Sequence, residues 1–84
     1  MFRYRVIELR CFSQELGRHS KYGVLAEQKR RGSWIAKAVT AELPANREAV
    51  TALAEKWTTY QLDPIHLADV VADIFFEQCM EEEA

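Results

Sequence analysis

The sequence is poor in the residues that build catalytic and metal sites. Its 84 residues include two histidines, two cysteines and three glycines, and they contain no G-x-S-x-G, H-E-x-x-H, P-loop or G-x-G-x-x-G motif. His19 and His66 have no serine or cysteine at a spacing that indicates a nucleophile with its base. A chain this short also has little room for a closed substrate pocket. We therefore expect a protein that is not an enzyme, has no cofactor and binds no small-molecule substrate.

Long apolar runs are also missing. No stretch of about 18 apolar residues is present, so we expect no membrane-spanning segment. Met1 leads directly into alternating residues, without the apolar run and small-residue cleavage site of a signal peptide. These features favour a cytoplasmic protein.

The two cysteines, Cys11 and Cys79, are far apart in the chain and belong to no CxxC or Cys/His pattern. In a cytoplasmic protein, such residues are usually small buried hydrophobic side chains. A disulfide or a redox switch is the alternative that the sequence leaves open.

Charge divides the chain into two halves. Residues 1–40 hold nine Lys or Arg and three acids, a net charge of +6, whereas residues 41–84 hold two bases and ten acids, a net charge of −8. The overall charge of −2 argues against a dedicated nucleic-acid-binding protein, although the basic half keeps that function open. We expect the two halves to attract each other, within the chain or between chains.

The basic half alternates apolar and polar residues, which is the period of β-strands. Three strands are expected, at residues 2–12, 22–29 and 34–41. The alternation changes phase at Val6 and Ile7, which predicts a bulge there. The polar residues 13–20 predict a loop. Residues 29–33 predict a hairpin turn in which Gly32 supplies a positive φ angle.

The acidic half has the period of helices. A first helix is expected from the N-cap Asn46 to about Tyr60, with one apolar face. A second helix starts clearly, because Asp63 is a favourable N-cap and Pro64 stands at the first helical position. We expect this helix to run to about Met80.

The apolar surface of the second helix is too wide for one interface. The apolar residues at the centre and on the flanks of this surface leave only a narrow polar strip on the helix. A helix on the surface of a domain needs an apolar arc of only roughly 100°. The apolar residues are Leu67, Val70, Val71, Ile74 and Phe75, flanked by Ile65, Ala68, Ala72, Phe76 and Cys79. The helix is therefore either enclosed within its own domain or in contact with another chain. Ile74 and Phe76, with Trp34 on the sheet, are the candidate partner-contacting residues.

Two polar groups of residues have weaker functional interpretations. The basic residues Lys29, Arg30, Arg31 and Lys37 form a candidate nucleic-acid contact, or else a solvated hairpin tip. His66, Asp69, Asp73 and Glu77 share one helix face and have ligand-type side chains. No second cluster accompanies this strip, so a solvated polar face explains it and we assign no metal site.

One segment resembles a known family. Residues 62–73 match the pattern L-x-P-x-H-L-x-D-V-V-x-D, which is similar to the C-terminal signature of a family of short bacterial proteins known only as a domain of unknown function. Tyr4 and the Tyr22-Gly23 pair match the family's strand starts, whereas Pro44-Ala45 stands where a Ser or Thr cap is expected. The resemblance implies a bacterial cytoplasmic protein and brings no activity, cofactor or catalytic residue.

These observations predict one α+β domain over residues 1–80, with an acidic tail at 81–84. A three-stranded antiparallel meander sheet is expected to precede two helices packed on one face, in the order β-β-β-α-α. The predicted function is a non-catalytic protein-interaction or regulatory module, homodimeric through the second helix. A nucleic-acid-binding domain that uses the basic hairpin around Arg30 and Arg31 is the alternative.

Overall fold

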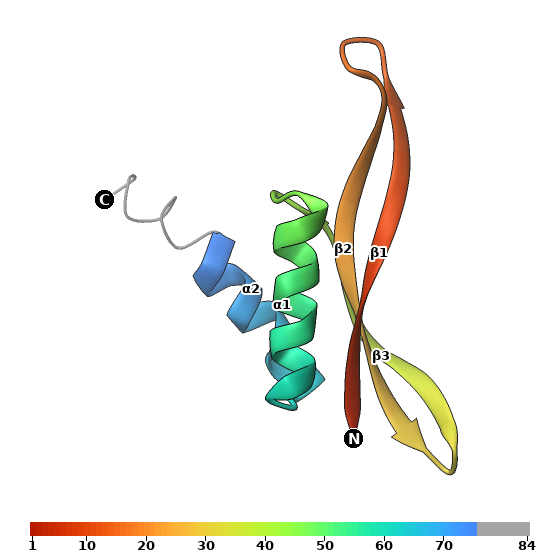
Figure 1. Cartoon of the computed structure of the whole chain (residues 1–84), viewed down its shortest axis with the longest axis vertical. Coiled ribbons are helices and arrows are strands. Elements are labelled where there is room, and N and C mark those ends of the chain that lie inside the picture. Colours follow the sequence, from red (N-terminus) through yellow and green to blue (C-terminus); the bar gives the residue numbers. More distant parts are fainter. Residues whose placement is uncertain (76–84) are drawn as a thin grey trace.

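The computed structural model describes residues 1–75 and confirms the predicted α+β fold. The chain forms three strands, β1 (Phe2–Ser13), β2 (Gly17–Arg30) and β3 (Ser33–Leu43). A helix α1 (Arg47–Thr59), a single 3-10 turn η1 (Pro64–His66) and a helix α2 (Leu67–Phe75) follow. Both helices lie on the same side of the sheet (Figure 1).

The sheet is an antiparallel meander in the order β1-β2-β3. The loop expected at residues 13–20 is mostly strand, because β1 and β2 stay paired out to Ser13 and Gly17. This pairing makes a long two-stranded arm that projects beyond the helices (Figure 1). Strands in this arm have no core to pack on, so their sequence does not alternate between apolar and polar residues. The prediction of a loop was wrong because it depended on that alternation.

The bulge expected at Val6 and Ile7 was also wrong. β1 and β2 pair without any register shift, and both irregularities lie between β2 and β3. One falls where Lys37 is the extra residue on β3, and the other where Gly23 faces two residues of β3. Gly23 is buried there, and a Cβ atom on it would lie 2.1 Å from the carbonyl oxygen of Thr40. A side chain is therefore excluded at this position.

The turn between β2 and β3 follows the prediction at Gly32, which has a φ of 80°. Arg31 beside it also has a positive φ, of 50°. Two central residues with positive φ are typical of the type I′ turn, whose twist suits a tight hairpin. The basic tip is therefore a sharp turn.

Helix α1 begins as the sequence predicts. The Oδ1 atom of Asn46 accepts a hydrogen bond from the backbone N–H of Ala49 at 2.9 Å, which satisfies one of the free donors at the helix start. Val50, Ala54 and Trp57 are buried against the sheet. Tyr60, at which the helix was expected to end, is its C-cap and is 75% exposed.

The second helical segment starts at the predicted residues but in two parts. Asp63 caps η1 by accepting from the N–H of Ile65 at 3.1 Å, and Pro64 is the first helical residue. The α-helical turns begin only at Leu67. The end expected near Met80, together with Phe76, Cys79 and the acidic tail, lies outside the described residues.

The core lies between the helices and the inner face of the sheet. Val24 and Val50 are fully buried at its centre, and the ring of Tyr4 meets that of Trp57 edge-on at 5.8 Å between centroids. The buried apolar residues are Tyr4, Val24, Ala26, Leu43, Val50, Ala54, Trp57, Leu67 and Val71. Because this core draws on all three strands and both helices, residues 1–75 pack as one unit.

Candidate protein-interaction surface

Helix α2 and the turn before it bury only part of their apolar surface. Leu67 and Val71 are buried in the core, whereas Ile65 remains 73% exposed and Ile74 47% exposed. Ala68 and Ala72 on the same segment are also exposed. Within the described chain, the sheet and α1 therefore cover only one side of η1 and α2.

The exposed residues border a groove between β3 and α2. One pocket of about 340 Å³ is lined by Ala38, Val39 and Thr40 of β3, and by residues of η1 and α2 that include Ile65 and Ala68. We call this feature the β3–α2 groove. Val39, at its rim, is 61% exposed. Exposed aliphatic side chains around a concave surface are typical of an interaction site.

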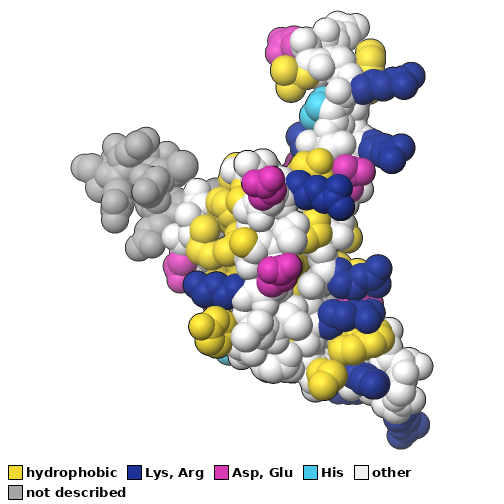
Figure 2. Space-filling view, in the orientation of Figure 1, with side chains coloured by type: hydrophobic (Ala, Val, Ile, Leu, Met, Phe, Trp, Pro, Cys, Tyr) yellow, Lys and Arg dark blue, Asp and Glu magenta, His cyan; other side chains and the backbone are white. Residues whose placement is uncertain are grey.

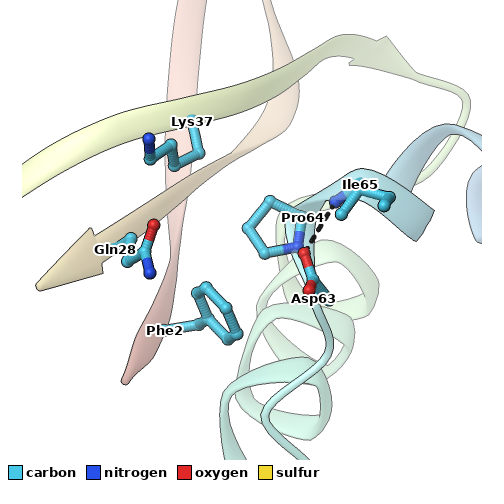
Figure 3. A pocket seen from close by; sticks show the side chains of 6 residues that line it. All are labelled: Phe2, Gln28, Lys37, Asp63, Pro64 and Ile65. Atoms are coloured by element: carbon cyan, nitrogen blue, oxygen red, sulfur yellow. Dashed lines mark hydrogen bonds between the residues drawn. The ribbon is translucent and has the colours of Figure 1, made fainter.

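A second pocket extends the groove towards the start of β1. It has a volume of about 310 Å³ and shares Pro64 and Ile65 with the first. Figure 3 shows Gln28 and Lys37 on the strands, with Pro64 and Ile65 across the pocket and the Phe2 ring between them. The two pockets together form a channel beside β3.

Tyr4 fixes the segment that forms one wall of this channel. Its hydroxyl donates a hydrogen bond to the carbonyl oxygen of Leu62 at 2.5 Å, so β1 holds the linker between the helices. Burial, and next the negative charge of Asp63, raise the pKa of Tyr4 to about 12. The neutral phenol is therefore the form that keeps η1 and α2 in place.

The two edges of the sheet differ. At the β1 edge, the side-chain amide of Gln61 accepts from the N–H of Phe2 at 2.8 Å and donates to its carbonyl at 2.9 Å. The hydroxyl of Thr58 accepts from the N–H of Tyr4 at 2.9 Å. The end of α1 thus takes the place of a neighbouring strand. Within residues 1–75, only β2 hydrogen-bonds to the backbone of residues 35–42 in β3.

The outer face of the sheet carries a compact ionic cluster. Glu27, only 7% exposed, accepts from Arg3 through one oxygen, at 2.9 Å from Nη2 and 3.0 Å from Nε. Arg5 approaches the same oxygen at 3.6 Å. The guanidinium of Arg3 lies 4.1 Å from the centroid of the Trp34 ring. The cluster joins all three strands and occupies one face of that ring.

We expect Glu27→Gln to lower the free energy of unfolding by about 1–2 kcal/mol, because it leaves two neighbouring guanidinium groups without their shared carboxylate. Glu55→Gln is the matched control, since Glu55 is exposed and has no ion pair within the described chain. Urea unfolding of both variants measures the difference. Equal midpoints for the two variants would contradict this role of Glu27.

The basic residues gather on the sheet. Figure 2 shows Lys and Arg side chains along the strands, from the arm to the opposite hairpin. Lys29, Arg30, Arg31 and Lys37 are all exposed, and no carboxylate within residues 1–75 pairs with them. The four ion pairs of the described chain all join residues of the sheet. One of them, between Lys21 and Glu42 at 3.7 Å, joins the basic half to the acidic half, and the helices contribute to none of the four.

The structure separates the residues that the sequence grouped as a partner interface. Ile74 lies on α2, on the helical side, whereas Trp34 contacts Arg3 on the outer face of the sheet. Phe76 lies outside the described residues. Within residues 1–75, no group of three or more His, Cys, Asp or Glu side chains is arranged to hold a metal ion. Cys11 is half-buried and free, and its possible partner Cys79 is not described.

Comparison with known proteins identifies the family. A model of a family of unknown function, DUF6514, matches residues 1–77, so the chain belongs to that family. No curated protein and no solved structure matches. Among the described residues, no helix has the length and apolar character needed to cross a membrane.

Sequence reasoning missed two parts of this surface. Val39 falls within the strand expected at residues 34–41, but whether another element covers the edge beside it depends on the tertiary fold. The roles of Thr58 and Gln61 at the β1 edge were also missed, because neither residue stands in a recognisable motif. The width of the apolar face on the second helix was the signal that did identify Ile65 and Ile74.

Proposed function

We propose that this chain is a non-catalytic protein-interaction or regulatory module that forms a homodimer through its second helix. The observation that carries this proposal is the exposed apolar side of η1 and α2, which includes Ile65, Ala68 and Ile74. Removing such side chains from water stabilises association by about 25 cal/mol for each Å² of apolar area buried. The neighbouring groove, which Ala38 and Thr40 of β3 also line, continues the same surface.

Replacing Ile65 with glutamate tests this proposal. A charge at the centre of the interface would be desolvated without a partner, so we expect the dissociation constant of the dimer to rise at least about tenfold. Ile65 is 73% exposed, so the fold itself should lose no more than about 0.5 kcal/mol. Sedimentation equilibrium measures the association.

Leu16→Glu provides the matched control. Leu16 is 71% exposed at the turn of the β1–β2 arm, and the same change of side chain there should leave the dimer intact. If Ile65→Glu and Leu16→Glu associate equally well, the second helix is not the interface and the proposal fails.

The basic hairpin supports nucleic-acid binding as a second candidate function. Lys29, Arg30 and Arg31 carry no ion pair within residues 1–75, and they lie at a sharp turn that projects from the sheet (Figure 1). A two-stranded ribbon fits the major groove of B-DNA. Trp34 is less suited to base stacking, because Arg3 already covers one face of its ring.

For this second candidate, we expect fluorescence anisotropy to show binding of duplex DNA that weakens steeply with salt. The double variant Arg30→Glu/Arg31→Glu should weaken that binding at least about tenfold, because it removes two phosphate contacts and adds repulsion. The double variant Arg47→Glu/Lys56→Glu on α1, where both residues are exposed, is the control with the same change of total charge. An unchanged affinity in the hairpin variant would exclude this function.

We further propose that residues 62–73 are a family signature and that the protein works in the bacterial cytoplasm. The resemblance of this segment to short bacterial proteins supports both statements. Its fixed positions have structural roles that explain such a pattern, since Pro64, Leu67 and Val71 are buried. Fractionation of bacterial cells with an antibody to the chain tests the compartment.

A further inference from the structure

The β1–β2 arm extends beyond the rest of the described fold as a ribbon of two strands. β3 pairs with β2 only as far as Tyr22, so residues 9–21 project past the three-stranded sheet and the helices (Figure 1). We propose that this arm binds a single-stranded nucleic acid, with Arg10 and Arg18 on its phosphates and Phe12 stacked on a base. The inference depends neither on the homodimer nor on the basic β2–β3 hairpin.

The strand register places these side chains on one face of the ribbon. Arg10 pairs with Ser20 and Phe12 pairs with Arg18, and β1 and β2 have no register shift. Residues directly opposite each other in an antiparallel pair point to the same face, as do residues two apart along one strand. Phe12 is therefore a neighbour of both guanidinium groups, of Arg10 along β1 and of Arg18 across the ladder.

The ring of Phe12 is open to a ligand. It is 74% exposed, and the residues beside it on this face are exposed as well. A hollow of about 450 Å³ on the arm is lined by Arg10, Cys11, Phe12, Arg18, His19 and Ser20. An exposed ring can receive any base, and such stacking contributes about 1–3 kcal/mol for each base. Because neighbouring bases cover these faces in a duplex, the ring favours a single strand.

The two arginines are available to phosphate groups. Arg18 is exposed and has no ion pair within residues 1–75. Arg10 pairs only with Glu8, at 3.6 Å, and its own side chain is 89% exposed. An ion pair this exposed contributes little to stability, so a phosphate can take the place of the carboxylate.

The composition of the arm favours nucleic acid as the ligand. Residues 9–21 contain three bases and one acid, Glu15, which lies in the turn beyond the paired strands. Figure 2 shows hydrophobic and basic side chains next to one another on the arm. Guanidinium groups bind phosphate through two parallel N–H bonds. Two of them beside an exposed ring match a ligand that carries both phosphates and aromatic bases.

Fluorescence anisotropy with labelled oligothymidylate and oligouridylate of about six nucleotides tests the site. We expect binding that weakens steeply with salt, and the tighter probe assigns the strand to DNA or to RNA. Phe12→Leu keeps an apolar side chain without the ring, so it should weaken binding about tenfold, whereas Phe12→Trp should bind at least as tightly. Tyr60→Leu, at a ring that is 75% exposed at the end of α1, is the matched control.

Charge reversal on the arm tests the phosphate contacts. Arg10→Glu/Arg18→Glu should weaken binding at least about tenfold and lower its salt dependence, because two phosphate contacts are lost. Arg47→Glu/Lys56→Glu on α1 is the control with the same change of total charge. Circular dichroism checks that each variant keeps its fold.

The outcomes separate the arm from the other proposed surfaces. Arg30→Glu/Arg31→Glu should leave the affinity for these short probes within about threefold, because those residues lie at the opposite hairpin (Figure 1). The inference is overturned if neither probe binds at low salt, or if the arm variants bind as tightly as the natural chain. Binding of anionic lipid vesicles without binding of either probe would also overturn it, in favour of a membrane surface. None of these results bears on the homodimer through α2.

Discussion

Replacing Gly23 with alanine is expected to lower the free energy of unfolding by about 3 kcal/mol or more, which is a large part of the stability of so small a domain. The new Cβ atom would lie 2.1 Å from the carbonyl oxygen of Thr40 and 2.8 Å from the Cα of Ala41. Both are backbone atoms of β3, so relief requires β3 to move away from β2. Thermal and urea unfolding measure the loss.

Gly17→Ala is the control for this substitution. Gly17 has a φ of 66° and nothing within 4 Å of the position that a Cβ atom would take. Its replacement should therefore cost only the backbone strain of a left-handed residue, about 1–2 kcal/mol. A loss at Gly23 no larger than that at Gly17 would show that β3 does not approach β2 as closely as the structure describes.

The stability of the protein should fall by about 2 kcal/mol as the pH rises from 10 to 12. Burial and the Asp63 carboxylate raise the pKa of Tyr4 to about 12 in the folded protein, against about 10 in the unfolded chain. The folded state therefore favours the neutral phenol. Its contribution is complete below pH 10 and is lost as the pH rises through the folded pKa. Urea unfolding at a series of pH values measures the change.

Tyr4→Phe separates this effect from the titration of other groups. The variant lacks the hydroxyl that donates to Leu62, so at pH 8 it should be less stable by about 1–2 kcal/mol. Above pH 10 the difference between the two proteins should shrink, because only the natural chain then loses the neutral phenol. Parallel stability curves from pH 8 to pH 12 would contradict the raised pKa.

Local signals in the sequence predicted much of the fold. Asn46 and Asp63 cap helical segments as expected, since a side chain that satisfies free N–H groups acts over only three residues. Gly32 likewise marks its turn through its own backbone angle. The excess apolar width of the second helix left two outcomes open, enclosure within its own domain or contact with another chain, and the structure leaves Ile65 and Ile74 exposed.

The failed predictions concern contacts between distant parts of the chain. The apolar–polar alternation of β1 changes phase after Val6 although no bulge is present there. It changes because β1 extends beyond the helices, and the next residues, Glu8, Leu9 and Arg10, are all exposed. In the sequence, Glu27 has the pattern of a solvent-exposed strand residue. In the structure, Arg3 and Arg5 of the neighbouring strand cover its carboxylate. Such burial depends on strand pairing, which a local pattern does not contain.

The predicted meander order already placed the third strand at a border of the sheet. Whether another element covers the free edge of β3 was unpredictable for the same reason. The contribution of α1 to the opposite edge depends on Thr58 and Gln61, whose partners lie more than fifty residues earlier in the sequence. Interaction surfaces of this type therefore become visible only when the fold is known.

Light scattering during gel filtration, at low and at high salt, tests the proposed homodimer most directly. The account predicts twice the chain mass of 9.7 kDa at both salt concentrations, because the contacts of Ile65 and Ile74 are apolar and salt does not screen them. A mass of one chain at every concentration and both salt levels would contradict the account.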